Sequence, residues 1–203
     1  MINTYFEYDN KEIDHLRHAD KRLGAAIDQI GIILRKVNPD VFAALIESII
    51  GQQISAKAAN TVAGRLHALS GMDCNRLQEL TIEEIQACGM SVRKAGYIKG
   101  AAQAAVDGTI DFAQLAQMDD AEVIKTLTAL DGIGIWTAEM LLIFSLMRPN
   151  VVSYGDLAIR RGMMHLYDYE KLTKQQFNRH AMQYAPYGTV ASLYLWEIST
   201  WKE

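Results

Sequence analysis

One stretch of this chain constrains its fold more than any other: residues 130–161, which read LDGIGIWTAEMLLIFSLMRPNVVSYGDLAIRR. It opens with a tight turn at 131–134 that contains two glycines. The apolar run that follows predicts a helix over 135–147, which Pro149 helps to stop because proline lacks an amide hydrogen. A short apolar loop then leads to a single carboxylate, Asp156. The order is therefore turn, helix, loop and carboxylate.

The two glycines of the turn, Gly132 and Gly134, favour a site for an anion. Without a Cβ both can adopt positive φ and leave their N–H groups uncovered, next to the unpaired N–H groups of a new helix. Phosphate is the usual ligand of such a cluster. The alternative is a plain helix–helix connection. Upstream, Asp119 and Glu122 have the spacing of a capping box that begins a preceding helix, so the unit is a helix, a hairpin and a second helix.

Composition limits the possible functions. A chain of 203 residues with 50% hydrophobic content can bury a real core, as one large domain or two joined lobes. The net charge of −4 means that any contact with nucleic acid must come from a local basic patch. Two cysteines, Cys74 and Cys88, are too few for a disulfide framework and indicate a reducing compartment. With no signal peptide and no apolar run long enough to cross a membrane, we expect a cytoplasmic protein without a membrane partner.

Helical periodicity dominates the rest of the sequence. One helix is predicted over 11–36, and Asn38 is predicted to cap the next. Capping motifs at Thr81 and Thr173 begin two more helices. No strand pattern is long enough to found a sheet, so the expected fold class is all-α.

A polar break interrupts two apolar helices at Gln52-Gln53-Ile54, and Ser55 is expected to cap the helix that follows. The glutamines either satisfy the helix ends or have a functional role. Further on, Arg93, Lys94 and Lys99 form the densest positive patch of the chain. These side chains either hold phosphates or form a solvated helix face.

Three stretches in this order resemble one family. The hairpin 130–138 with Asp156 downstream looks like the signature of helix-hairpin-helix (HhH-GPD) DNA glycosylases, and residues 49–59 and 184–196 are similar to the alkylpurine, or 3-methyladenine DNA glycosylase II, branch. Together the three stretches cover most of residues 40–200. The resemblance implies two helical lobes, one of residues 38–148 and one of residues 1–37 plus 149–203. The hairpin, residues 130–136, and Asp156 would face the cleft between them, and no N-terminal β domain is expected.

The resemblance also implies the chemistry of Asp156. Breaking the N-glycosidic bond of a purine builds positive charge on the deoxyribose, which a fixed carboxylate stabilises. The same carboxylate can orient or deprotonate the attacking water. An alkylated purine is already a cationic leaving group, so one carboxylate suffices. The competing interpretation of Asp156 is an ordinary helix N-cap, and both roles can coexist.

Further roles follow from the same resemblance. Such an enzyme swings a nucleotide out of the duplex and fills the gap with a side chain; Gln53 is the candidate wedge, with Gln52 or Ile54 beside it. Trp136 and Tyr184 are candidates for the base pocket, against the alternative of core packing. Residues expected to contact DNA are Gly132, Gly134, Ile135, Thr137, Gln52, Gln53, Ser55, Arg93 and Lys94.

Trp136 occupies the hairpin position where strand-cutting relatives carry a lysine that forms a Schiff base, and an indole cannot do so. A monofunctional glycosylase that uses water is therefore expected. No organic cofactor is expected, and no iron-sulfur cluster, because no cysteine lies beyond Cys88. The resemblance implies a Na⁺ or K⁺ ion on the backbone carbonyls of Thr128, Leu130 and Ile133.

The leading hypothesis is thus a monomeric base excision repair enzyme that acts on double-stranded DNA with alkylated bases. If its source is bacterial, it would be associated with the nucleoid. The alternatives are a non-catalytic helix-hairpin-helix DNA-binding module, which has no use for Asp156, a bifunctional glycosylase and lyase, and an all-α interaction scaffold.

Overall fold

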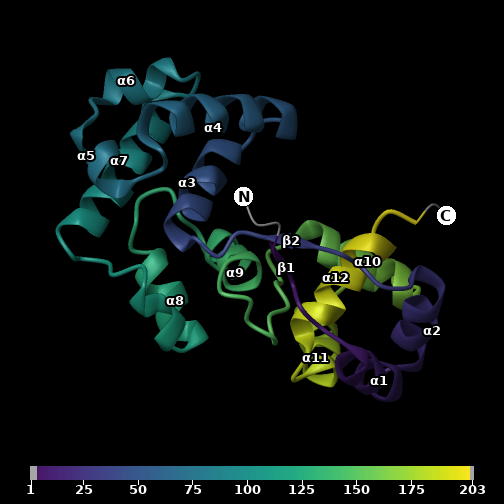
Figure 1. The fold of residues 1–203 in the computed structure, drawn as a ribbon. Coiled ribbons are helices and arrows are strands. Elements are labelled where there is room, and N and C mark those ends of the chain that lie inside the picture. The colour runs from purple at the N-terminus through teal and green to yellow at the C-terminus, as the bar shows by residue number, and fades with distance from the viewer. Residues whose placement is uncertain (1–3, 202–203) are drawn as a thin grey trace. The chain divides into compact units, whose positions relative to one another are not determined.

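The computed structural model describes residues 4–201, which form twelve α-helices, one short 3₁₀ helix and a two-stranded sheet (Figure 1). The elements in order are β1 Thr4–Tyr5, α1 Asn10–Ala19, α2 Lys21–Ile30, β2 Lys36–Val37, α3 Val41–Gly51, α4 Ala56–Ser70, α5 Cys74–Glu79, α6 Ile82–Ala87, α7 Val92–Val106, the 3₁₀ helix Gln114–Gln117, α8 Asp120–Leu127, α9 Ile135–Phe144, α10 Leu157–Tyr167, α11 Lys174–Tyr184 and α12 Gly188–Ile198. The sheet pairs Thr4 with Val37 and Tyr5 with Lys36 in antiparallel fashion. With strands of only two residues, the predicted all-α class is confirmed.

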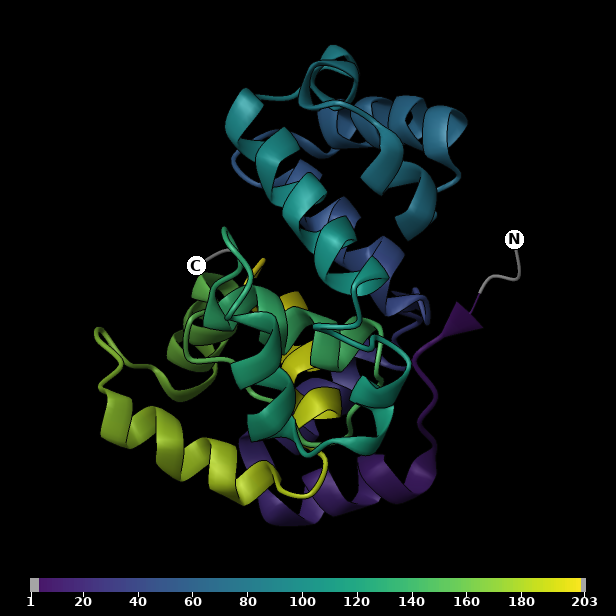
Figure 2. The same cartoon turned by 90° about the vertical axis from the view of Figure 1, so that its left-hand side faces the viewer.

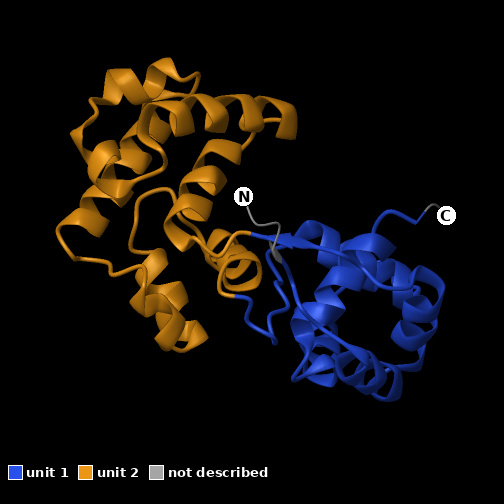
Figure 3. Cartoon of the chain, viewed as in Figure 1, with its two compact units in different colours: residues 1–37, 147–203 blue, residues 38–146 orange. Residues whose placement is uncertain are grey.

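The chain divides into two compact units, coloured separately in Figure 3. Unit 2 is continuous and runs from Asn38 to Leu146, whereas unit 1 combines the residues up to Val37 with those from Met147 onward. Each unit therefore has its own core, and unit 1 is made from both ends of the chain.

The core of unit 2 forms around α3, whose buried face includes Leu45, Ile46, Ile49 and Ile50. This helix packs against α4, α7 and α9, and Figure 2 shows α3 and α7 running beside each other. The small helices α5 and α6 cover α7, and α8 packs on α9. The hairpin between α8 and α9 is thus fixed on a helix that is itself part of the core.

The core of unit 1 depends on a close approach between α10 and α12, which lie together in Figure 1. A Cβ at Gly162 on α10 would collide with the backbone carbonyl of Leu195 on α12. Only glycine lets the two backbones come this near. The surrounding core consists of apolar side chains from α1, α2, α10, α11 and α12, among them Leu16, Leu23, Ile159, Met163, Phe177, Leu193 and Ile198.

Three predicted boundaries were wrong. The helix predicted over 11–36 is two helices, because Asp20 is extended and caps α2 by accepting from the Leu23 amide. The N-cap of α3 is Asp40, not Asn38, since its carboxylate accepts from the Ala43 amide. The helix predicted over 135–147 ends at Phe144. By contrast, the predicted capping boxes of α6, α8 and α11 are present.

Among residues 4–201, no helix combines the length and the apolar character that crossing a bilayer requires.

We predict that Gly162→Ala destabilises unit 1, because its methyl group would push the α10 backbone away from Leu195. The free energy of unfolding should fall by roughly 1–3 kcal/mol, measured by thermal or denaturant unfolding. The matched control is Gly64→Ala in α4, where a Cβ meets nothing within 4 Å. That variant should gain about 0.5–1 kcal/mol from helix propensity. Equal stability of both variants would contradict the close approach.

Candidate active site

The carboxylate of Asp156 begins α10 and is held by three N–H donors. Its Oδ1 accepts from the amides of Ala158 and Ile159, each at 2.9 Å, and from the indole Nε1 of Trp196 at 3.2 Å. The side chain is only 7% exposed. A carboxylate this buried is costly unless it is hydrogen-bonded, and each bond to a charged group contributes about 1.5–3 kcal/mol. Asp156 is the N-cap that the sequence suggested, and the carboxylate is rigidly held.

The loop that precedes Asp156 is anchored to the first turn of α12. The Val151 amide donates to the Thr189 hydroxyl at 3.0 Å, and the Ser192 hydroxyl donates to the Val151 carbonyl at 2.8 Å. The Gly188 amide donates to the Asn150 side chain at 3.1 Å. A Cβ at Gly188 would collide with that same side chain, so the glycine is needed for the contact. Helix α12 therefore fixes both the loop and the Asp156 carboxylate at the end of that loop.

The hairpin between α8 and α9 turns at Gly132, whose φ is +79°. The ring of Tyr97 from α7 packs where a Cβ of this glycine would be. Gly134, in contrast, has a φ of −95° and serves as the N-cap of α9 without a side-chain hydrogen bond. The expectation of positive φ at both glycines is therefore correct for Gly132 only.

The turn after α3 is tied to this hairpin through Gln52. Its side-chain amide donates to the Gly132 carbonyl at 3.0 Å. The next residue, Gln53, is exposed and has a φ of +58°, a left-handed conformation that costs a non-glycine residue about 1–3 kcal/mol. Ile54 is partly exposed, and Ser55 caps α4 by accepting from the Ala58 amide at 3.3 Å. The side chain of Gln52 is thus hydrogen-bonded to the hairpin, whereas Gln53 lies at the exposed tip of the turn.

The residues of the predicted basic patch have different surroundings in the structure. The Nζ of Lys94 donates to the carbonyls of Ile50 and Gln52, at 2.7 and 2.5 Å, and so caps the C-terminal end of α3. Burial lowers the pKa of Lys94 from its usual value. Lys99 likewise donates to the carbonyls of Gln78 and Leu80 at the end of α5.

These contacts give Lys94 a structural role that the sequence did not predict. Its ammonium is used to terminate a helix, which is favourable because the end of a helix carries partial negative charge. Arg93, the neighbouring residue, is exposed. Of the two DNA contacts expected in this patch, Arg93 is exposed, whereas Lys94 is partly buried and bonded to the end of α3.

One pocket collects several of the predicted residues within unit 2. It has a volume of about 250 Å³ and is lined by Gln52, Gln53, Ile54, Gly89, Met90, Ser91, Arg93, Lys94 and Tyr97. The structure therefore brings the turn after α3 and the start of α7 together, next to the hairpin that Gln52 and Tyr97 contact.

The first turn of α9 presents two of its predicted residues at the surface. Ile135 is 62% exposed and Trp136 is 45% exposed. Thr137 is buried, so its side chain belongs to the packing of unit 2. An indole exposed to this extent is available to a ligand, which core packing alone would not require.

Tyr184, the other predicted residue of the base pocket, has no exposed surface. It lies in the core of unit 1, where its hydroxyl shares a hydrogen bond of 2.6 Å with the hydroxyl of Tyr167. Tyr167 in turn donates to the buried carboxylate of Asp20 at 2.6 Å. Burial raises the pKa of Tyr184 well above its ordinary value. The core-packing alternative describes this position, and we assign Tyr184 to the core rather than to a pocket.

The three carbonyls expected to hold a monovalent cation lie on the turn between α8 and α9. Thr128 is the C-cap of α8, where the last carbonyls of a helix lack intrahelical partners. The Leu130 carbonyl accepts from the Ile133 amide at 3.2 Å, which uses one of its two lone pairs. Neutral carbonyl oxygens are a ligand type that monovalent ions accept. No group of three or more His, Cys, Asp or Glu residues within residues 4–201 is arranged for a metal.

A larger pocket, of about 810 Å³, lies elsewhere in unit 2 and is lined in part by Asp40, Asp73 and Asp111. Three carboxylates repel phosphate, so we do not assign this pocket to nucleic acid.

Comparison with known proteins identifies the family. Residues 46–186 match the model of the HhH-GPD superfamily base excision DNA repair proteins, more than half of the chain. The chain belongs to this superfamily. The resemblance inferred from the three sequence stretches is thereby confirmed.

Individual relatives support the assignment of this chain to the HhH-GPD superfamily. The DNA-3-methyladenine glycosylase 1 of Schizosaccharomyces pombe is 37% identical over 161 residues, which cover 76% of the chain and 71% of the relative. The crystal structure of a DNA-3-methyladenine glycosidase from Bacillus halodurans superimposes with a TM-score of 0.88 at 36% identity, covering 97% and 93% of the two chains. The S. pombe 3-methyladenine DNA glycosylase in complex with abasic DNA gives 0.79 at 32% identity, covering 92% and 95%.

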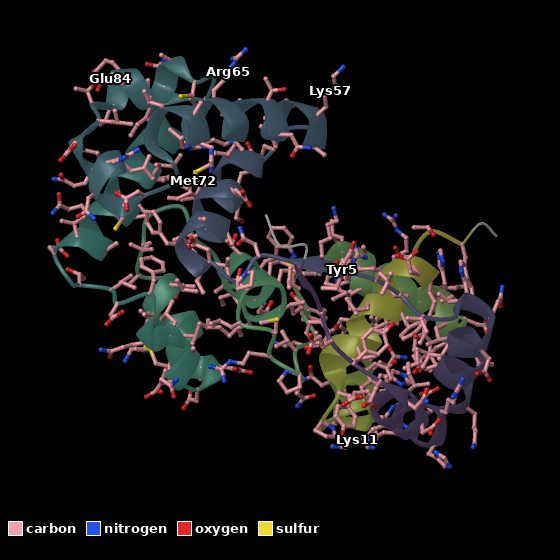
Figure 4. All side chains as sticks on the ribbon, in the orientation of Figure 1. Tyr5, Lys11, Lys57, Arg65, Met72 and Glu84 are labelled. Atoms are coloured by element: carbon pink, nitrogen blue, oxygen red, sulfur yellow. The ribbon has the colours of Figure 1, made fainter. Side chains whose placement is uncertain are left out.

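Two residues that contact the candidate site of this HhH-GPD protein were missed by sequence reasoning. Trp196 donates to Asp156 from a position 40 residues downstream, and Tyr97 packs on Gly132 from another helix. Neither contact leaves a local signal. Lys57 projects from the beginning of α4 in Figure 4, close in sequence to the turn at Gln53. Its exposed charge near a candidate contact could have been recognised from the sequence.

We predict that Lys94→Met destabilises the HhH-GPD protein, because the carbonyls of Ile50 and Gln52 lose their cationic donor. The loss should be about 1–3 kcal/mol in the free energy of unfolding. Arg93→Met is the matched control, since it removes a neighbouring but exposed charge and should change stability by less than about 0.5 kcal/mol. Similar stability of the two variants would show that Lys94 does not cap α3.

Proposed function

We propose that this protein is a monofunctional DNA glycosylase that removes alkylated purines, such as 3-methyladenine, from double-stranded DNA in base excision repair. The observation that carries the proposal is the buried, triply hydrogen-bonded Asp156 at the expected distance in sequence after the hairpin. Support also comes from relatives at 36–37% identity that are named DNA-3-methyladenine glycosylase 1 and DNA-3-methyladenine glycosidase.

The proposed reaction breaks the bond between C1′ of the deoxyribose and the purine nitrogen. The bonding electrons leave with the base, so a cationic alkylated purine departs as a neutral molecule. The sugar is left with oxocarbenium-like positive charge, which the Asp156 carboxylate stabilises where it develops. Water then adds to C1′ and gives up a proton, and the products are a free base and an abasic site. Because Asp156 is held rigidly, little reorganisation is needed as the charge forms.

Trp136 is proposed to bind the base. The face of an indole attracts a cation by roughly 0.5–2 kcal/mol, which favours an alkylated purine over an unmodified one. Its 45% exposed ring is consistent with this role. An indole has no amine for Schiff-base formation, which supports hydrolysis rather than lyase chemistry.

DNA is proposed to be held by unit 2 through the hairpin and the neighbouring turn. The N–H groups around Gly132 and Gly134 suit a phosphate at the beginning of α9. Gln53 is proposed as the wedge, because Gln52 is already bonded to the hairpin and Gln53 is exposed at the tip of its turn. Arg93 and Ser55 lie on the exposed surface beside it.

A monovalent cation on the carbonyls of Thr128, Leu130 and Ile133 is proposed to strengthen this contact when bound, by adding positive charge next to a DNA phosphate. We expect duplex affinity, measured by fluorescence anisotropy, to be higher in sodium or potassium chloride than in tetramethylammonium chloride of equal ionic strength. Equal ionic strength keeps the release of counterions from DNA comparable. Identical affinities in all three salts would argue against the ion.

The central experiment measures base release. Wild-type protein and Asp156→Asn are incubated with methylated duplex DNA, and free 3-methyladenine and 7-methylguanine are quantified by chromatography. Wild type should release base, whereas the neutral amide should slow release by two orders of magnitude or more, because removing one charge-stabilising group typically costs 10²–10³ in rate. Duplex binding should persist in both.

Other outcomes would change the proposal. Equal release by both proteins would remove Asp156 from the mechanism. Binding without release by wild type would favour a non-catalytic DNA-binding module, and a borohydride-trapped covalent adduct would favour a lyase.

A further inference from the structure

Trp196 approaches Asp156 from α12, and its indole N–H donates to the Oδ1 atom that also accepts two backbone amides. The two amides come from the first turn of α10 itself and move with it. The indole is a donor from a different element. It therefore connects the orientation of the carboxylate to the position of α12.

The indole is itself held in place from a second side. The guanidinium carbon of Arg35 lies over its ring, 5.6 Å from the ring centroid. The same guanidinium lies 3.6 Å from the carboxylate of Glu197, the residue after Trp196. Arg35 comes from the segment that leads into β2, far away in sequence. The ring is thus fixed by Asp156 at its edge and by Arg35 over its face.

The backbone geometry of unit 1 makes this contact possible. Gly162 allows α10 to pass close to Leu195, the residue immediately before Trp196. The loop before Asp156 is anchored on Thr189 and Ser192 of the same helix. Trp196 and Asp156 are consequently placed by one rigid pair of helices and not by flexible side chains alone.

We propose that Trp196 is a positioning residue for the glycosylase reaction: its indole N–H holds the Asp156 carboxylate in the orientation that stabilises the developing sugar cation. This inference rests on the proposed function. Trp196 acts through Asp156 and needs no contact with DNA. Its removal should therefore lower the rate of bond cleavage and leave DNA affinity unchanged.

The decisive variant is Trp196→Phe, which keeps an aromatic ring for packing and for Arg35 but lacks the N–H. The single-turnover rate of 3-methyladenine release at saturating protein should fall roughly tenfold, as expected for loss of one hydrogen bond to a charged group. Affinity for duplex DNA that contains a tetrahydrofuran abasic analogue should remain within about twofold. A merely structural role would not separate rate from affinity in this way.

The matched control is Tyr194→Phe. It removes another side-chain donor from α12, the hydroxyl that bonds the Gly31 carbonyl at 3.0 Å, without touching Asp156. Its rate and affinity should equal those of wild type. An equal fall in rate for this control, or an unchanged rate for Trp196→Phe, would overturn the proposal.

A measurement independent of catalysis tests the contact itself. The chain has three tryptophans, so its ¹H–¹⁵N spectrum shows three indole signals, and the one absent from Trp196→Phe belongs to Trp196. This signal should move upfield in Asp156→Asn, where the acceptor loses its charge. If Trp196→Phe fails to fold, selective labelling and assignment in wild type give the same reading. An unchanged chemical shift of the Trp196 indole signal in Asp156→Asn would overturn the proposal.

The two tests also separate this proposal from the function on which it rests. If wild type releases no base, the proposed function fails and the positioning role with it, even where the indole signal reports the contact. If wild type releases base but the indole signal is insensitive to Asp156→Asn, only the role of Trp196 fails.

Discussion

The hydrogen bonds to Oδ1 of Asp156 are the interaction on which unit 1 is organised. A carboxylate at the beginning of a helix is favoured by the partial positive charge of the helix end, and the two amides of α10 supply that charge directly. The same two bonds terminate the loop and start the helix. A group suited to stabilise a cation is therefore also the group that determines where α10 begins. Structure and proposed chemistry depend on one negative charge.

Glycines give this arrangement its compactness. Gly162 and Gly188 each occupy a place where a Cβ would collide with a neighbour, and both lie where α12 meets another part of unit 1. At the hairpin of unit 2, Gly132 plays a corresponding part beneath Tyr97. The missing side chain allows the Leu195 backbone to approach at Gly162, the Asn150 and Val152 side chains at Gly188, and the Tyr97 ring at Gly132. At these positions the packing requires a residue without a Cβ.

Local signals in the sequence predicted much of this structure. The capping boxes at Thr81, Asp119 and Thr173 depend on residues three apart, so the sequence displays them directly. The all-α class follows from helical periodicity in the same way. The break at Asp20 was missed although its cap on the Leu23 amide is local; the second partner of this carboxylate, Tyr167, lies 147 residues away. A pattern read over a few residues contains no information about such a partner.

The same limit applies to two side chains of the candidate site. Lys94 looked like part of a basic patch, but its acceptors are the carbonyls of Ile50 and Gln52, more than forty residues earlier. Tyr184 stands in a stretch that resembles the family, yet its ring is enclosed by residues from distant helices. Sequence identified which residue types matter and could not assign each side chain to surface or core.

The two-unit arrangement has a consequence for how the protein is made. Unit 2 is one continuous segment, whereas unit 1 needs both ends of the chain. During synthesis on the ribosome, unit 2 can complete its fold before α10, α11 and α12, the helices that pack against α1 and α2, have been made. This follows because domains fold as units and the N-terminal part of a chain emerges first. The indole of Trp196 emerges after the whole of unit 2. A chain terminated between unit 2 and Trp196 can thus contain a finished hairpin unit but lacks the indole that donates to the Asp156 carboxylate.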